Sequence, residues 1–203
     1  VLDLEGISTP LVQHETIYLW GMQVFGLSRG EYIASTARMH TINGENSESE
    51  QIAADRAAWQ DFLASAKTLF SQYGDLRFIH YSHYEGTSIT KYIARYGDYE
   101  GIGARIHRSL LDLRPLIPET VTLPVHSYSL KVVEKQAGYE RSQEEYGGLW
   151  SVAKYFEALD SQDPRVYDAT LEQIRIYNRE DLEATWAVFE WMAQEFGNVP
   201  STS

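Results

Sequence analysis

The spacing of hydrophobic residues divides the chain into a strand-like N-terminal part and a mostly helical remainder. Alternating segments, or segments rich in β-branched and aromatic residues, predict strands at 1–5, 17–25 and 31–37. Apolar residues then recur at helical spacing over 47–73, and a continuous apolar run at 76–81 is typical of a buried strand. Further helices are predicted at 88–96, 129–136, 148–159 and 165–196, and 110–117 fits either a strand or a helix.

The order of these elements predicts an α/β fold with a mixed sheet, because strands come first, one further strand lies between helices, and helices follow. We find no internal repeat and no linker long enough to separate domains, so residues 1–203 are expected to form one domain. The chain begins with Val1, inside a strand-like segment, rather than with Met. We therefore expect it to be a fragment of a longer or processed chain.

The chain is acidic, since 29 Asp and Glu residues against 17 Lys and Arg residues give a formal net charge of −12. Taken at face value, this balance argues against a nucleic-acid-binding protein, because contacts with phosphate require Lys and Arg, and the need for solubility would by itself explain the acidity. The absence of cysteine excludes disulfides, zinc–thiolate sites, iron–sulfur clusters and thiol nucleophiles. No apolar run reaches the ~20 residues of a membrane helix and no signal peptide is visible, so we expect a cytoplasmic protein with no membrane partner.

Two acidic residues share one face of the first predicted strand. Asp3 and Glu5 are two residues apart, so their side chains point the same way, about 7 Å apart or closer. A solvated face of an edge strand is the alternative explanation. Glu85 follows the strand at 76–81, and the end of a central strand is where α/β sheets place their ligands. An acid at a helix N-terminus is the alternative there.

The helix predicted at 165–196 carries an acid on an apolar face. Asp181 lies between Ile174 and Val188 on this face, and Tyr177 lies one turn earlier on the same side. Either a salt bridge to an arginine or a metal ion would compensate for this carboxylate. The other acids of this helix are expected to face solvent: Glu172, Glu180, Glu183 and Glu190.

Together, Asp3, Glu5, Glu85 and Asp181 suggest a metal site. Carboxylate oxygens are hard ligands that suit Mg²⁺ or Mn²⁺. Four such groups would hold two ions about 3.5–4 Å apart, which is the arrangement used for in-line phosphoryl displacement. The sequence contains no Gly-rich phosphate-binding loop that would suggest energy coupling instead.

In their order and spacing, these motifs resemble the DEDD superfamily of 3′–5′ exonucleases, in the subclass with Tyr-x-x-x-Asp as its third motif. Glu85 stands where most members carry Asp. This departure, with SYSLKVVEKQAGYE (127–140) and YNREDLEATW (177–186), is similar to the YprB-like predicted nucleases, which often follow a RecB-like nuclease domain. The resemblance covers essentially the whole chain and implies an RNase H-like three-layer fold, with a mixed central β-sheet flanked by helices.

The resemblance also implies roles for the motif residues around two Mg²⁺ or Mn²⁺ ions. Asp3, Glu5 and Asp181 would bind the first ion, Asp3 would also reach the second, and Glu85 would act mainly through a bound water. Tyr177 would orient the attacking water. The leading hypothesis is therefore a metal-dependent 3′–5′ exonuclease of single-stranded or frayed DNA or RNA, working with a fused or partner nuclease or helicase domain.

Two alternatives remain open: a catalytically weak or inactive nucleic-acid- or protein-binding module on the same fold, and an RNase H-like endonuclease. The candidates for substrate binding lie around and after Glu85. His83 and Tyr84 flank it, and Lys91 and Arg95 belong to a stretch with an excess of basic residues. Core packing and a solvated helix face are the alternative explanations for these four residues.

Overall fold

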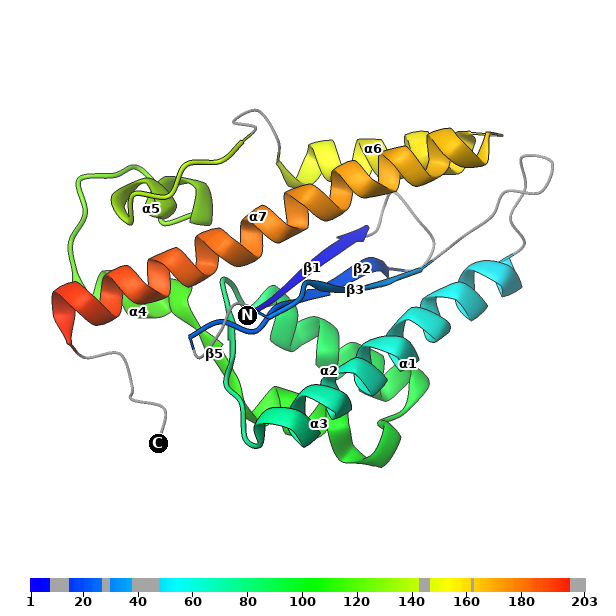
Figure 1. The fold of residues 1–203 in the computed structure, drawn as a ribbon, viewed down its shortest axis with the longest axis horizontal. Helices are drawn as coiled ribbons and strands as arrows, with labels where there is room; N and C mark the ends of the chain where they lie inside the picture. Colours follow the sequence, from blue (N-terminus) through cyan, green and yellow to red (C-terminus); the bar gives the residue numbers. More distant parts are fainter. Residues whose placement is uncertain (8–14, 27–29, 38–47, 143–146, 162, 198–203) are drawn as a thin grey trace.

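The computed structural model describes residues 1–203 except 8–14, 27–29, 38–47, 143–146, 162 and 198–203 (Figure 1). β1 (Leu2–Ile7), β2 (Thr16–Met22) and β3 (Ile33–Thr36) form an antiparallel sheet in the order β1-β2-β3. Every residue of the central strand β2 is buried, because both faces of this strand are covered. In the ladder between β1 and β2, Asp3 lies opposite Gly21, and the register shifts directly after Glu5.

β4 (Phe78–His80) and β5 (Leu110–Asp112) form a second sheet of two parallel strands. Their crossover contains α2 (Tyr84–Tyr96), the 3₁₀ turn η1 (Tyr99–Gly101) and α3 (Ile102–Arg108). The prediction of a single mixed sheet is therefore wrong for the described residues, whose strands form two sheets. β4 lies near β1, but it has only three residues, and all three pair with β5.

Helices cover both faces of the three-stranded sheet, so this part of the molecule has three layers (Figure 1). α1 (Glu48–Tyr73) packs on β2 and β3, and α2 and α3 lie on the same side. α6 (Gly148–Asp160) and the long α7 (Pro164–Phe196) cover the other face, and α5 (Leu130–Gln136) packs on α7. The path of α7 over β1 and β2 positions the candidate site.

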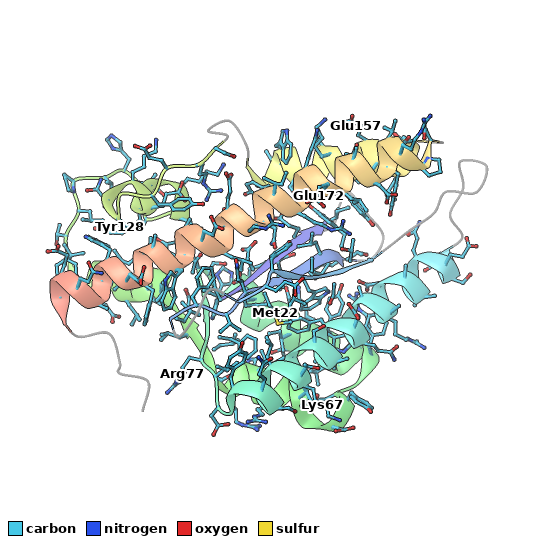
Figure 2. The ribbon with its side chains drawn as sticks, in the orientation of Figure 1. Met22, Lys67, Arg77, Tyr128, Glu157 and Glu172 are labelled. Carbon is cyan, nitrogen blue, oxygen red and sulfur yellow. The ribbon has the colours of Figure 1, made fainter. Side chains whose placement is uncertain are left out.

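Aromatic residues fill the core between the sheet and α1. The Trp20 ring lies 4.6 Å from the Phe62 ring and 4.9 Å from the Tyr92 ring, measured between centroids. Phe62 belongs to the apolar stripe that the sequence predicts over 47–73, and its burial shows that this stripe faces the core. Met22 also lies in this interior, whereas Lys67 projects from the outer surface of α1 (Figure 2).

The segment 110–117, which fitted a strand or a helix, contains both. β5 ends at Asp112, and α4 (Leu113–Thr120) begins at the next residue. The Asp112 carboxylate caps α4 by accepting a hydrogen bond of 3.0 Å from the Arg114 backbone N–H. α2 begins at Tyr84, before the predicted start at 88, so Glu85 lies in the first helical turn. None of the helices in the described ranges is long and apolar enough to span a membrane.

Candidate metal centre

Three of the predicted carboxylates converge where α7 passes over β1. Asp3 and Glu5 share one face of β1, as the two-residue period of a strand requires. Asp181 lies near the middle of α7 and faces the same point. One carboxylate oxygen from each of the three residues lies within 4.8 Å of the other two. We call this group the carboxylate cluster.

A buried amide fixes the carboxylate of Asp3. The Asn178 side-chain amide donates a hydrogen bond of 2.7 Å to Asp3, and the Tyr32 hydroxyl donates one of 2.8 Å to the Asn178 carbonyl oxygen. Asn178 fits because Gly21 has no side chain, since a Cβ atom on Gly21 would lie 1.8 Å from the Asn178 oxygen. Sequence reasoning missed Asn178, although it precedes Asp181 by about one helical turn and that spacing was available as a signal.

Two hydroxyl groups hold the carboxylate of Glu5. Glu5 is buried, and the hydroxyls of Tyr18 and Ser151 both hydrogen-bond to it. The two hydroxyl oxygens also lie 2.6 Å from each other. Because Tyr18 belongs to β2 and Ser151 belongs to α6, the sheet and the helix layer fix Glu5 together.

Asp181 is bound by a tyrosine and by an arginine. The Tyr177 hydroxyl, one helical turn earlier, hydrogen-bonds to the Asp181 carboxylate. Arg141 Nη2 lies 2.5 Å from Asp181 Oδ1, and Arg141 also donates two hydrogen bonds of 2.7 Å to Glu134 of α5. The arginine salt bridge that the sequence left open is thus present, beside two further carboxylates.

The surroundings of the carboxylate cluster compensate its negative charge only in part. Burial raises the pKa of Asp3 and of Glu5 well above their ordinary values, and the charge of Asp181 raises both further. Burial also raises the pKa of Asp181, against the lowering effect of Arg141. Arg141 also pairs with Glu134, so its single positive charge does not balance the three carboxylates of the cluster. The cluster therefore retains hard oxygen donors with uncompensated negative charge. Such a donor set fits a divalent cation such as Mg²⁺ or Mn²⁺.

Glu85 is buried but lies outside the carboxylate cluster. His80 Nδ1 lies 3.1 Å from its carboxylate, and the Ser82 hydroxyl donates a hydrogen bond of 3.3 Å to it. The charge of Glu85 still raises the pKa of Asp3, after the larger effects of burial and of the two other clustered acids. Three of the four predicted acids therefore form the cluster, and the fourth, Glu85, lies near it in the first turn of α2.

Two of the predicted substrate-binding residues lie at the N-terminus of α2. His83 directly precedes the helix, and its side chain is exposed. The Tyr84 hydroxyl is directed toward Gly6 of β1, where an added Cβ atom would lie 2.2 Å from it. Tyr84 is also packed against the hydrophobic core. The described contacts of Tyr84 are therefore those of a packing residue.

The two predicted basic residues lie farther along α2. Lys91 pairs with Glu15, and Arg95 pairs with Asp55 and donates a hydrogen bond of 2.7 Å to the Glu15 carbonyl oxygen. At 1.5 Å per residue, Lys91 and Arg95 lie about 9 and 15 Å beyond Glu85 along the helix axis. Their described ion pairs are with these acids and not with the carboxylate cluster.

Two acids that were expected to face solvent instead hold the segment after α5. Glu180 is buried and accepts a hydrogen bond of 2.8 Å from the Ser142 backbone N–H. Glu183 accepts one of 3.2 Å from the Tyr139 hydroxyl. The prediction of a solvated side chain is wrong for Glu180 because residues 139–142 lie over it. Helical periodicity could not have predicted the contact between Ser142 and Glu180, because these residues are 38 positions apart in the sequence.

Comparison with protein families places the chain in a known superfamily. The model of a family described as the RNase H superfamily matches residues 2–193. This span includes β1 with Asp3 and Glu5, and the part of α7 that carries Tyr177 and Asp181. No curated protein and no solved structure matches the chain. Because the family match extends over nearly the whole sequence, the chain belongs to the RNase H superfamily.

Proposed function

We propose that this chain is a metal-dependent 3′–5′ exonuclease that hydrolyses phosphodiester bonds in single-stranded or frayed DNA or RNA. The observation that carries the proposal is the convergence of Asp3, Glu5 and Asp181, with Tyr177 hydrogen-bonded to Asp181. Membership of the RNase H superfamily supports a nucleic-acid substrate and hydrolysis of phosphodiester bonds. The resemblance to DEDD exonucleases with a tyrosine in the third motif supports the direction of cleavage.

The carboxylate cluster would hold Mg²⁺ or Mn²⁺, which would activate water and offset the charge that develops on the phosphate. The chain fixes two of the ligands through its own hydrogen bonds. Asn178 orients Asp3, and the hydroxyls of Tyr18 and Ser151 orient Glu5. This preorganisation supports the proposal, because functional metal sites require placement to within about 0.5 Å.

Tyr177 would position the attacking water. Burial raises its pKa, and the charges of Asp181, Glu5 and Asp3 raise it further, so the hydroxyl stays protonated at neutral pH. A tyrosine hydroxyl donates one hydrogen bond and can accept another. While Tyr177 donates to Asp181, its oxygen can accept a hydrogen bond from a water beside the cluster and so orient that water.

In this proposal Asp3 and Glu85 would hold a second ion, with Glu85 acting mainly through a bound water. Glu85 hydrogen-bonds to His80 and lies outside the carboxylate cluster. Binding of a second ion would therefore require Glu85 to exchange or share its contact with His80. For this reason we expect the second ion to bind more weakly than the first.

The rival functions are an RNase H-like endonuclease and an inactive binding module. Tyr177, one turn before Asp181, favours the exonuclease, since it matches the third motif of the tyrosine subclass. The raised pKa values of the three clustered acids argue against an inactive module, because such a module gains nothing from unfavourable charge. A fused or partner nuclease or helicase domain and a cytoplasmic location remain parts of the proposal.

The test is cleavage of a 5′-labelled single-stranded oligonucleotide in the presence of Mn²⁺. We expect a ladder that shortens from the 3′ end, no cleavage with a metal chelator, and loss of the ladder in Asp3→Asn. Asp61→Asn is the matched control, because Asp61 is an exposed acid of α1, far along the chain from the motifs. A wild-type protein that leaves the oligonucleotide intact, or an equally active Asp3→Asn variant, would refute the proposal. Cleavage of a circular strand would favour the endonuclease.

A further inference from the structure

Residues 139–142, which follow α5, are fixed on α7 at three points around the carboxylate cluster. The Tyr139 hydroxyl donates to Glu183, the Ser142 backbone N–H donates to Glu180, and Arg141 pairs with Asp181. These three acids lie within four consecutive residues of α7, 180–183. In the ribbon, α5 lies beside α7 (Figure 1). The position of Arg141 is therefore set by contacts on both sides of it.

The guanidinium of Arg141 has one nitrogen that no described residue satisfies. Nε and Nη2 donate to Glu134, and Nη2 also contacts Asp181. Nη1 has no hydrogen-bond partner among the described residues, although only 4% of the side chain is exposed. A buried donor without a partner costs free energy, so an acceptor brought by a ligand would stabilise this arrangement. A phosphate oxygen is the acceptor that guanidinium groups bind most favourably.

A second cation lies on the same side of the cluster. Lys131 Nζ lies 5.5 Å from the centre of the Tyr177 ring, and Arg141 Cζ lies 5.8 Å from it. Lys131 has no carboxylate within 4.0 Å among the described residues, in contrast to Lys91 on α2. Both cations line a cavity of about 530 Å³, whose other charged lining residues are Glu134, Lys135 and Glu140. The two positive charges thus flank the side chain proposed to position the attacking water.

We propose that Lys131 and Arg141 bind a phosphate group of the substrate on the α5 side of the carboxylate cluster. Arg141 supplies the Nη1 hydrogen bond at a fixed position, and Lys131 supplies a positive charge that has no ion-pair partner within 4.0 Å among the described residues. This inference rests on the proposed function for the identity of the phosphate as that of a nucleotide. It assigns substrate binding to α5 and residues 139–142, whereas the sequence suggested Lys91 and Arg95 of α2.

Calorimetric titration with thymidine 5′-monophosphate, a product-type ligand that needs no turnover, tests this assignment in the presence of Mn²⁺. Lys131→Met is expected to weaken its binding about tenfold, which is the usual effect of losing one charge-assisted contact. Lys67→Met is the control, because Lys67 lies on α1, on the opposite face of the sheet, where it pairs with Glu100 outside this cavity. Thymidine, which lacks the phosphate, should bind equally to the wild type and to Lys131→Met.

The affinity for Mn²⁺ provides a second readout, which should not fall together with the affinity for the nucleotide. Removing the Lys131 charge should leave the Mn²⁺ affinity unchanged or raise it, because Lys131 repels cations and ligates none. Arg141→Lys should also weaken nucleotide binding, and Lys131→Met keeps the test decisive if the Arg141 variant fails to fold. Nucleotide affinities equal to wild type in both folded variants would overturn the assignment.

The inference and the proposed function can fail separately. An active exonuclease whose Lys131→Met variant binds the nucleotide normally would refute only the phosphate site. A wild type that binds inorganic phosphate through Lys131, but neither binds Mn²⁺ nor cuts an oligonucleotide, would support the phosphate site and refute the exonuclease.

Discussion

Replacing Asp3 with Asn should stabilise the metal-free protein while removing its response to metal. Asparagine keeps an oxygen that can accept the hydrogen bond from Asn178, so the change removes charge with little change in shape. At a separation of 4.8 Å, which is the upper limit for the clustered oxygens, two negative charges repel each other by about 3 kcal/mol at an effective dielectric constant of about 20. Arg141 and partial protonation offset some of this repulsion. We therefore expect Asp3→Asn to gain about 1–3 kcal/mol at pH 8, or roughly 3–10 °C in Tm.

The same cluster gives the wild type a characteristic pH dependence. Burial raises the pKa of Asp3 above its ordinary value of 3.8 and that of Glu5 above 4.5. The native protein then holds more protons than the unfolded chain as pH rises from those ordinary values toward the raised ones. Stability without metal should fall across this window, by about 1.4 kcal/mol per pH unit for each extra proton held. Within this window, one extra proton corresponds to a loss of roughly 3–6 °C in Tm for each pH unit.

Thermal unfolding at pH 5, 6, 7 and 8, with a chelator or with Mn²⁺, measures both effects. Bound Mn²⁺ should flatten the pH dependence of the wild type, since the ion replaces protons on the cluster. Asp3→Asn should show a shallower slope without metal and little gain from Mn²⁺. If Asp3→Asn lowers the Tm at pH 8, or keeps the wild-type slope and the wild-type gain from Mn²⁺, the electrostatic reasoning is wrong.

Three further variants test separate parts of the site. Gly21→Ala places a Cβ atom 1.8 Å from the Asn178 oxygen and should cost about 1–3 kcal/mol in urea unfolding, whereas Gly148→Ala, with open space around it, should be nearly neutral. Tyr177→Phe should lower kcat about 10²-fold or more with an unchanged Mn²⁺ affinity, and an unchanged kcat would remove Tyr177 from the chemistry. Glu85→Gln should reduce the calorimetric stoichiometry from two Mn²⁺ ions to one, and an unaltered stoichiometry of two would exclude Glu85 as a ligand.

The parts of the site that lie on regular elements could be predicted from the sequence. The two-residue period of a strand places Asp3 and Glu5 on one face of β1. The helical period places Asp181 on the same face of α7 as Tyr177, one turn later. Each period fixes the direction of a side chain relative to its neighbours in the same element. The resemblance to DEDD exonucleases supplied the pairing of these elements, which the two periods do not contain.

The contacts that depend on irregular segments could not be predicted. Arg141 lies outside any helix or strand, and its partners Glu134 and Asp181 come from two different helices. Glu180 was expected in solvent because nothing in the helical pattern shows that Ser142 packs against it. Division of the strands into two sheets was missed for a similar reason, since ladder partners are long-range and β4 has only three residues.

The central claim is that Asp3, Glu5 and Asp181 together bind a catalytic divalent ion. Anomalous diffraction from a crystal of the protein soaked in Mn²⁺ tests it most directly. We expect a strong peak at coordination distance from all three carboxylates, with a weaker second peak between Asp3 and Glu85. The strong peak should be absent in crystals of Asp3→Asn. A fully soaked crystal with no peak at the cluster, and with the Arg141–Asp181 pair unchanged, would contradict the account.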